Sequence, residues 1–313
     1  WTGVLHGWFA RFDRAGARIG GDGPLPGTWT FDAAWNGAGF ALVWCRDDEA
    51  WMQLLAKDGE TVGPPVLLVF RADEHCDRLG VAWDGEGFDV FSIWNSRSLR
   101  FVRTGADAVP LTGDLLVGEA ADRDLQCVSV AASPVSALAA VATVRSGTSW
   151  RSELAVVGLD GAVLATAAPV GSFESGAGGG MPQAAWDGEQ FGVVSFGGTP
   201  DHVAPYLTRL SPSGELRGPP AALVEDCRSL DLTLAAGLGW AAASRRELVS
   251  GELLFVRADT EGRIVQRLAL DAPAWSDIGW GSMSLAYDGE GFGIVGWNAG
   301  IRTPMFTRFA FGP

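Results

Sequence analysis

The side chains best suited to chemistry are acids, arginines and a few histidines in irregular stretches between apolar segments. The acidic stretches are Asp73-Glu74-His75-Cys76-Asp77, Asp122-Arg123-Asp124, Glu225-Asp226-Cys227 and Trp275-Ser276-Asp277. Carboxylates of this kind can hold Ca²⁺ through oxygen ligands or accept hydrogen bonds from sugar hydroxyls. For any one of them, hydration and pairing with a neighbouring arginine is the simpler explanation, because such exposed pairs contribute little energy.

The sequence gives little support to several catalytic chemistries. It has only three histidines, His6, His75 and His202, and no GxSxG nucleophile motif. The glycine run at 176–180 lacks the lysine that a phosphate-binding loop needs. No CxxC spacing or other ligand set predicts a metal, so no cofactor is expected apart from Ca²⁺ on the carboxylates. A pair of acids acting as a glycan hydrolase or lyase remains an alternative, because their separation cannot be read from sequence.

Charge and hydropathy exclude two kinds of partner. The formal net charge is -14, and Lys57 is the single lysine among 23 basic residues. Such a surface repels nucleic-acid phosphates unless a basic patch intervenes, and no Lys/Arg-rich run is present. No apolar stretch reaches the roughly 18 residues that a membrane-spanning helix requires. We therefore expect neither a nucleic-acid partner nor a transmembrane segment.

One motif recurs along the chain and predicts the fold. Clear copies are Ala34-Trp35-Asn36-Gly37-Ala38-Gly39-Phe40, Ala82-Trp83-Asp84-Gly85-Glu86-Gly87-Phe88, Ala185-Trp186-Asp187-Gly188-Glu189-Gln190-Phe191 and Ala286-Tyr287-Asp288-Gly289-Glu290-Gly291-Phe292. Two longer intervals contain degenerate copies, at 131–140 and 235–240, which gives six copies about 50 residues apart. In each, an apolar strand ends at an aromatic, Asp-Gly or Asn-Gly supplies a turn with positive φ, and an apolar strand returns.

A second hairpin alternates with the first. Its turns are at 13–16, 57–59, 104–107, 159–161, 212–214 and 260–262. Apolar and polar residues alternate along the strand at 207–210, which predicts that one of its faces is exposed to solvent. Two hairpins per repeat make a four-stranded antiparallel unit, the size of a propeller blade. The sequence therefore predicts an all-β, six-bladed β-propeller as one domain over 1–313, with the N- and C-terminal segments sharing a blade. A seven-bladed ring and an open repeat array are the alternatives.

The segment Ala82 to Phe88, with its following strand and second Gly turn, resembles a bacterial repeat family with units of the type AWDG-x-x-aromatic-x-x-x-W. The resemblance covers nearly the whole chain, although the copies at 131–140 and 235–240 depart from the pattern. It implies a propeller-like fold and an exported protein: secreted, periplasmic or at the cell surface. The motif consists of turn and core residues, so it carries no catalytic residues to this chain.

Blade geometry indicates where function should lie. The tight Gly turns share one edge of the blades, whereas the longer, chemically richer loops share the other, and function commonly lies on such loops. The candidate ligand-binding residues on the loop-rich edge are Arg46, Asp73, His75, Asp77, Arg97, Asp124, Arg145, Glu174, Asp226, Arg245, Trp275 and Asp277. The leading hypothesis is a non-enzymatic recognition module for a glycan or a protein, and a structural domain of a surface assembly is the third alternative.

Cysteines and tryptophans add two expectations. All four cysteines map to the loop-rich edge, where Cys45 and Cys76 can bridge neighbouring blades, whereas Cys127 and Cys227 would need loops that reach across. Tryptophans at repeat positions are expected in the core: Trp35, Trp44, Trp83, Trp94, Trp186 and Trp297. Those outside the repeat positions, Trp51, Trp275 and Trp280, are candidates for stacking on a ligand or for covering a blade edge.

Overall fold

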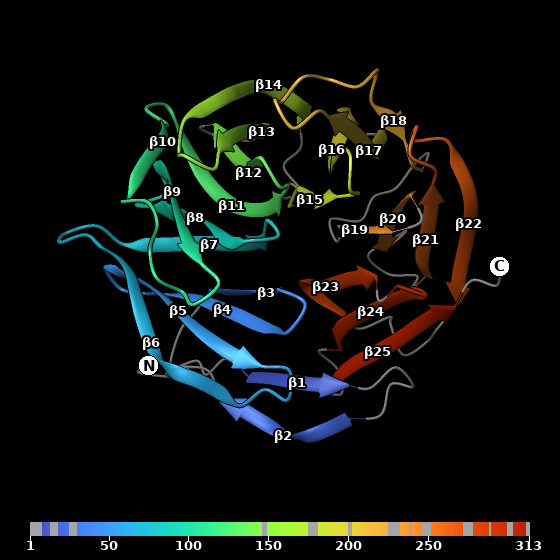
Figure 1. The fold of residues 1–313 in the computed structure, drawn as a ribbon. Helices are drawn as coiled ribbons and strands as arrows, with labels where there is room; N and C mark the ends of the chain where they lie inside the picture. Colours follow the sequence, from blue (N-terminus) through green and yellow to red (C-terminus); the bar gives the residue numbers. More distant parts are fainter. Residues whose placement is uncertain are drawn as a thin grey trace, which may run out of the picture. The chain divides into compact units, whose positions relative to one another are not determined.

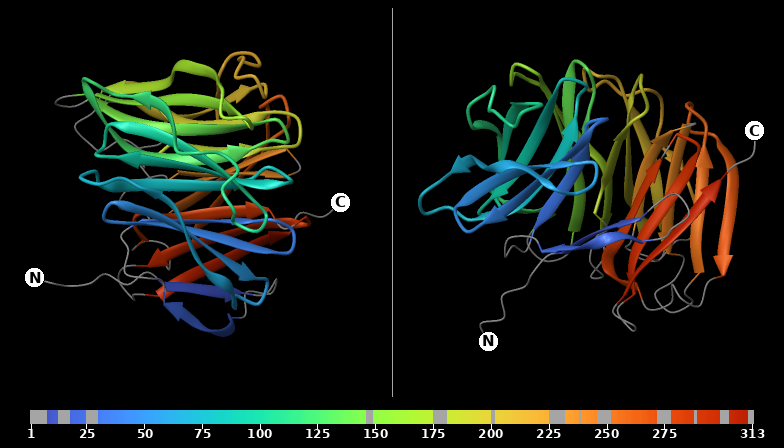
Figure 2. Two further views of the ribbon diagram at one scale, coloured as in Figure 1. Left: turned by 60° about the vertical axis from the view of Figure 1, so that its left-hand side comes forward. Right: turned by 60° about the horizontal axis from the view of Figure 1, so that its bottom comes forward.

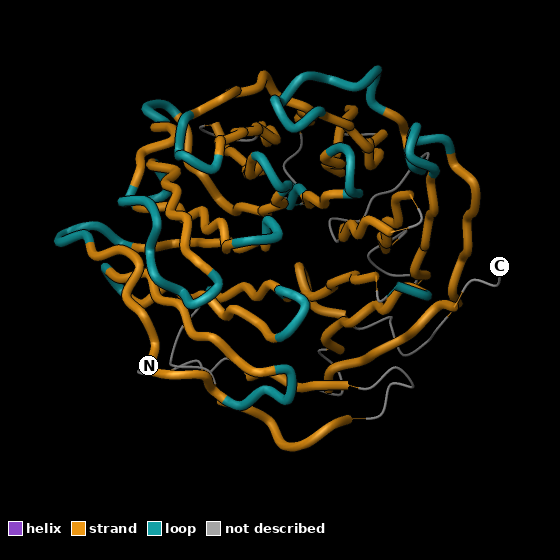
Figure 3. Tube along the Cα trace, in the orientation of Figure 1, coloured by secondary structure: helices purple, strands orange, loops and turns teal. Residues whose placement is uncertain are grey.

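The computed structural model describes residues 8–12, 18–24, 30–145, 149–174, 181–199, 202–224, 232–237, 239–245, 252–271, 278–287, 289–298 and 303–310. In this part of the chain, strands are joined by loops and turns and no helix is present (Figure 3). Accordingly, none of these residues belongs to a helix that could cross a membrane. The prediction of an all-β protein is confirmed.

The chain divides into two compact units. The first comprises residues 1–139 and 155–165, and the second comprises residues 140–154 and 166–313. The division passes through three strands, β12 (Ser136–Arg145), β13 (Ser149–Gly158) and β14 (Val163–Glu174). Each unit is described by itself below.

The first unit contains two complete four-stranded antiparallel sheets (Figure 1). The first sheet is β3 (Phe31–Trp35), β4 (Gly39–Arg46), β5 (Glu49–Ala56) and β6 (Thr61–Phe70). The second is β7 (Cys76–Trp83), β8 (Gly87–Trp94), β9 (Ser98–Gly105) and β10 (Leu115–Glu119). Strands β1 (Trp8–Phe12) and β2 (Arg18–Pro24) pair with each other, and β11 (Arg123–Ala132) begins the next repeat.

Successive sheets of the first unit pack through their first strands. Strand β7 contacts β3 and β4 of the preceding sheet, and β11 in turn contacts β7 and β8. Figure 2 shows the blue and cyan sheets lying one against the other in its left-hand view. Apolar side chains from both sheets, including Val43, Met52, Phe88 and Trp94, form one buried core between them. Burial of this apolar surface is the main favourable term that holds the sheets together.

The second unit follows the same plan (Figure 1). Its strands are β15 (Gln183–Trp186), β16 (Phe191–Thr199), β17 (His202–Leu210) and β18 (Ala221–Ala222), then β19 (Leu232–Gly237), β20 (Gly239–Arg245), β21 (Glu252–Ala258) and β22 (Ile264–Asp271), then β23 (Ile278–Tyr287), β24 (Gly291–Asn298) and β25 (Thr303–Ala310). Strand β19 contacts β15 and β16 before it and β23 after it. Two apolar clusters fill these spaces, one around Trp240 and one around Phe255 and Phe292.

The turns of the repeats are as predicted. Gly37, Gly85, Gly188 and Gly289 of the first hairpins have φ between 92° and 108°. The residue before each such glycine organises the turn where its contacts are described: Asp84 Oδ1 accepts hydrogen bonds from the backbone N–H groups of Glu86 and Gly87 at 2.7 and 2.6 Å. In the degenerate copy at 131–140, the Ser133 hydroxyl performs the same role for the Ser136 N–H at 3.0 Å. A short side-chain acceptor at the start of the turn is thus common to these hairpins, and a positive-φ glycine follows it in the clear copies but not at Ser133-Pro134.

Two expectations about burial need correction. Residues 207–210 were expected to have one wet face, but Thr208 is fully buried and Arg209 is half-buried. Leu207 and Thr208 point to opposite faces of β17 and are both fully buried, so both faces of the strand are covered there. Trp35 was expected in the core and is 46 % exposed. It is the last residue of β3, where one face of its ring packs on Phe40, with ring centroids 4.6 Å apart.

The other described tryptophans divide between core and surface. Trp44 and Trp94 are buried as predicted, whereas Trp83 and Trp186 are half-buried against the phenylalanine of the returning strand. Trp51 stacks on Trp44 with the rings 9° from parallel. The side chains of Trp275, Trp280 and Trp297 lie outside the described residues.

Candidate binding site at the loops of the first unit

Three loops of the first unit meet at one end of its strands: the β4–β5 turn, the β6–β7 connection and the β8–β9 turn. Backbone hydrogen bonds join them. The Asp48 carbonyl accepts from the Arg71 N–H at 3.0 Å, and the Asp47 carbonyl accepts from the Cys76 N–H at 2.8 Å. The His75 carbonyl accepts from the Asn95 N–H at 2.8 Å, which ties the connection to the following turn.

The same pair of backbone hydrogen bonds between a connection and a turn recurs one repeat later. There the Arg97 carbonyl accepts from the Ala120 N–H at 2.8 Å and the Ser96 carbonyl from the Leu125 N–H at 2.7 Å. The turn residues Asp47 and Ser96 both have positive φ, 51° and 54°, which points their carbonyls toward the crossing chain. Because each connection is hydrogen-bonded to the turn beneath it, backbone contacts alone already hold these loops to one another.

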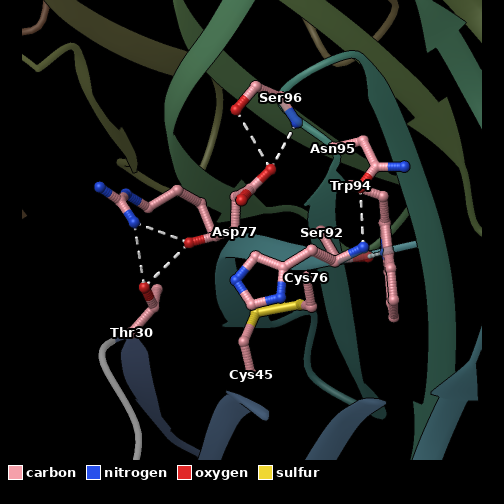
Figure 4. Close-up of a disulfide and its surroundings, with 10 residues drawn as sticks. Thr30, Cys45, Cys76, Asp77, Ser92, Trp94, Asn95 and Ser96 are labelled. Carbon is pink, nitrogen blue, oxygen red and sulfur yellow. Dashed lines mark hydrogen bonds between the residues drawn. A yellow bond between two sulfur atoms is a disulfide. The ribbon is translucent and has the colours of Figure 1, made fainter. Parts of the chain in front are cut away.

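A disulfide adds a covalent tie at the same place. Cys45, at the end of β4, is bonded to Cys76, the first residue of β7, with Cα atoms 5.4 Å apart (Figure 4). This bond joins two neighbouring sheets, as the sequence suggested. Of the other two cysteines, Cys127 is buried and Cys227 lies outside the described residues.

Asp77 links the disulfide region to the β8–β9 turn. One of its carboxylate oxygens accepts hydrogen bonds from the backbone N–H and the hydroxyl of Ser96, the latter at 3.2 Å (Figure 4). Its carbonyl accepts from Thr30 Oγ1 at 3.0 Å and from Arg78 Nη1 at 2.7 Å. Asp77 is therefore a structural acceptor that orders Thr30, Arg78 and Ser96 around the disulfide.

These groups surround a pocket of about 350 Å³. Its walls are Thr30, Cys45, Arg46, Asp47, His75, Cys76, Asp77 and Arg78. Arg46, Asp47 and His75 are exposed at its rim, and within the described residues no hydrogen bond or ion pair engages their side chains. The pocket thus presents unused donors and one unused carboxylate above a rigid floor.

An ion-pair cluster stiffens the outer part of the β6–β7 connection. Arg71 pairs with Glu74 within the connection and, through Nη1, with Asp114 Oδ2 at 2.9 Å, and Arg100 also reaches Asp114 at 3.2 Å. The hydrogen bond from Arg71 lowers the pKa of Glu74 from its usual value. These charges satisfy one another, so we assign them to holding the connection.

The structure brings together three of the predicted site residues, Arg46, His75 and Asp77, around this pocket. Asp73 is exposed on the same connection and Arg97 on the β8–β9 turn, but neither lines the pocket. Asp124 is exposed on β11. The remaining predicted site residues lie outside the described residues, in whole or in their side chains: Arg145, Glu174, Asp226, Arg245, Trp275 and Asp277.

Sequence reasoning did not single out Thr30, Asp47 and Arg78. The sequence does carry a signal for two of them, because Asp47 and Arg78 each lie two residues after a cysteine of the predicted disulfide, Cys45 and Cys76. No such signal marks Thr30, whose place depends on the fold. Across the described residues, no group of three or more His, Cys, Asp or Glu side chains is arranged to hold a metal ion.

Comparison with known proteins identifies the class of fold. No protein-family model matches the sequence, and no curated protein sequence matches it. Among solved structures, a Dos1 propeller is 9 % identical over 97 % of this chain and 73 % of that one, with a TM-score of 0.52. A structure from work on two prolyl endopeptidases is 12 % identical, with a TM-score of 0.51. That match covers 95 % of this chain but 46 % of the other, so this chain spans less than half of that protein's length.

An apocarotenoid oxygenase from Synechocystis is similar to the same degree: 10 % identity, 90 % of this chain, 68 % of that one and a TM-score of 0.50. Identities this low bear on the fold alone. Together with the repeated four-stranded antiparallel sheets, they define a β-propeller type of repeat fold.

Proposed function

We propose that this protein is a non-enzymatic recognition module that binds a carbohydrate in the pocket at the Cys45–Cys76 disulfide. The observation that carries the proposal is the combination of a fixed pocket floor with unused polar groups at the rim. Arg46 and His75 can donate hydrogen bonds to ligand oxygens, and Asp47 can accept from ligand hydroxyls. At about 350 Å³ the pocket falls in the size range of small-molecule sites.

Rigidity favours recognition of this kind. A ligand that binds to ordered loops does not have to pay for ordering them, so modest contacts suffice for affinity. In the first unit, the backbone hydrogen bonds between the loops and the Cys45–Cys76 disulfide provide that order before any ligand binds.

We further propose the finer architecture and setting that the sequence suggested. Six four-stranded repeats close into one propeller domain, with the N-terminal segment completing the blade of β23–β25, and the protein is exported. The disulfide supports an oxidising compartment. A single domain should unfold in one cooperative calorimetric transition, whereas two resolved transitions would contradict it.

A glycan array followed by calorimetric titration of the best glycan tests the binding proposal. Arg46→Ala and His75→Ala should each weaken binding at least tenfold. Lys57→Ala is the matched control, because it also removes one exposed cation from the first sheet but at the opposite end of its strands. It should leave affinity unchanged.

Other outcomes would reject the proposal. Glycan binding that is insensitive to both pocket variants would place the site elsewhere. Absence of glycan binding, together with saturable binding of a protein that Arg46→Ala abolishes, would make the pocket a protein-recognition site. Turnover of a bound glycan would overturn the non-enzymatic assignment.

A further inference from the structure

A second pocket lies in the second unit, at the tight-turn end of the strands, where no site was predicted. It has a volume of about 280 Å³ and is lined by Glu189, Gln190, Arg209, Arg217, Thr260 and Glu261. Three segments form it: the β15–β16 turn, the connection after β17 and the β21–β22 turn. It is independent of the pocket at the disulfide.

Arg209 is the central cation of this pocket. The guanidinium lies between two glycines: a Cβ on Gly218 would be 3.2 Å from Arg209 Nη2, and a Cβ on Gly262 would be 3.4 Å from Nε. Both glycines have positive φ, 87° and 81°, so larger side chains are disfavoured at both places. The turns therefore leave a slot that fits a flat guanidinium.

Most of the hydrogen-bonding capacity of Arg209 is unused. Its Nη1 donates to the Thr260 carbonyl at 3.2 Å, and no other hydrogen bond or ion pair of this side chain exists within the described residues. A guanidinium has five N–H donors. Arg217 lies beside it, because the Arg217 N–H donates to the Arg209 carbonyl at 2.8 Å, and the Arg217 side chain is exposed.

The acid that would be expected to neutralise Arg209 is already engaged. Asp187 Oδ1 holds the β15–β16 turn by accepting from the Glu189 and Gln190 N–H groups, both at 2.8 Å. Its Oδ2 accepts from the Gln190 side-chain amide at 3.2 Å, and the same amide nitrogen donates to the Thr260 carbonyl at 2.6 Å. Gln190 thus bridges Asp187 and the Thr260 carbonyl, to which Arg209 also donates.

We propose that Arg209 and Arg217 bind the carboxylate of a sugar acid in this pocket. Arginine pairs with a carboxylate through parallel N–H···O bonds, which a neutral sugar cannot provide. The exposed Glu189 carboxylate at the rim accepts hydrogen bonds from the ring hydroxyls. A singly charged carboxylate also suits a chain with a net charge of -14 better than a doubly charged phosphate does.

Titration at low ionic strength with four probes tests this assignment: glucuronate, glucose, acetate and inorganic phosphate. The readout is the Nε–Hε resonance of Arg209 in the ¹H–¹⁵N spectrum of the full chain. Glucuronate should shift that resonance saturably, acetate should do so more weakly, and glucose should leave it unmoved. Arg217→Gln should weaken glucuronate binding at least tenfold.

Two further variants make the test specific, followed by calorimetry instead of the arginine resonance where that side chain is absent. Arg209→Gln should abolish glucuronate binding, and Gln190→Gly should weaken it, because Asp187 then becomes free to occupy the guanidinium. Arg267→Gln is the matched control, since it removes an exposed arginine of β22 that does not line the pocket. Equal binding of glucose and glucuronate, tighter binding of phosphate, or glucuronate binding that survives Arg209→Gln would each overturn the proposal.

Discussion

The β7–β9 region of the first unit and the β15–β17 region of the second unit have the same hairpins but arrange their charges differently. The strand registers place their residues in equivalent pairs: Asp84 with Asp187, Gly87 with Gln190, Asp89 with Gly192, and Arg103 with Arg209. In the first region, Asp84 Oδ2 accepts from Arg103 Nε at 2.8 Å and lies 2.7 Å from its Nη2. In the second, the equivalent arginine is directed into a pocket.

One residue accounts for the difference. A Cβ on Gly87 would lie 2.3 Å from the Thr104 carbonyl oxygen and 3.4 Å from both Cζ and Nη2 of Arg103, so glycine fits closely where Arg103 reaches Asp84. Gln190 stands at the equivalent position in the second unit, and its side-chain amide donates a hydrogen bond to Asp187 Oδ2. The repeat therefore sets the backbone, and a single exchange decides whether its arginine is buried in an ion pair or available to a ligand.

A second exchange lies two residues further on. A Cβ on Gly192 would be 2.3 Å from the buried ring of Trp240 in the next sheet, so the second unit requires glycine there. The residue equivalent to Trp240 in the first unit is Ala137, whose side chain is much smaller. Asp89 is fully buried, and its oxygens have no hydrogen-bond partner.

The largest expected effect on stability comes from breaking the buried ion pair between Arg103 and Asp84. Arg103→Gln leaves Asp84, whose side chain is 1 % exposed, without its cation. Breaking one partner of such a pair costs about 3–5 kcal/mol, and we expect that loss in the free energy of unfolding from urea titration at pH 7. Arg209→Gln is the matched variant and should change it by no more than about 0.5 kcal/mol, because half-buried Arg209 has no ion pair within the described residues that the substitution would break. Equal effects at the two sites would show that their environments do not differ.

The next largest effect on stability is expected at Gly192, which packs against the ring of Trp240. Gly192→Ala forces a methyl group against a ring that is 1 % exposed and cannot move aside. Overpacking of this kind costs about 1–3 kcal/mol. Thermal unfolding should show a lower melting temperature for Gly192→Ala. Asp89→Ala, which shortens the equivalent side chain, should not lower the melting temperature at pH 8, and a drop there as large as that of Gly192→Ala would contradict the packing difference.

Asp89 should make stability depend on pH. Burial raises its pKa to about 8, the negative charge of Asp84 adds to the rise, and Arg103 opposes it. Below the unfolded-state value near 3.8 the carboxyl is protonated in both states, so the stabilising effect of the raised pKa is fully present. As the pH rises toward 8, the unfolded state gives up the proton and the folded state keeps it, so stability falls.

Asp89→Asn should remove this part of the pH dependence. We expect the variant to gain on the order of 1 kcal/mol over the parent between pH 7 and pH 8, measured by urea unfolding across that range. An unchanged slope would mean that Asp89 is ionised in the folded protein. Gly192→Asn would not be an equivalent control, because Trp240 leaves no room for the side chain.

The sequence was sufficient to predict the parts of the fold that repeat. Copies of the Ala-Trp-Asp-Gly segment placed the hairpins correctly, even at 235–240, where Gly237 and Gly239 still face each other across the turn. The Cys45–Cys76 bond followed from the same argument, because both residues were placed at one end of adjacent repeats. Periodicity and turn chemistry are local, so a single sequence carries them.

What could not be predicted depends on contacts between residues far apart in the sequence. The polar character of Arg209 suggested a wet outer face, and nothing in the sequence shows that Gly218 and Gly262 enclose its guanidinium. The tight-turn end was expected to be only structural because its turns are short and regular. Likewise Asp77 was chosen as a ligand-binding acid, although its carboxylate is engaged by Ser96 of the following turn. Both depend on which groups from different strands and turns meet in the folded chain.

The smallest expected effect is on the coupling energy between Asp187 and Arg209, which tests whether Gln190 in place of glycine keeps the two apart. In the parent protein Asp187 and Arg209 should be uncoupled, because the Gln190 amide lies between them. A double-mutant cycle with Asp187→Asn and Arg209→Gln should therefore give a coupling energy near zero. Repeated in a Gln190→Gly background, the cycle should give roughly 0.5–1 kcal/mol, as expected for a partly exposed ion pair. Coupling of equal size in both backgrounds would show that Gln190 does not control the pairing, and that something else directs this arginine away from its turn.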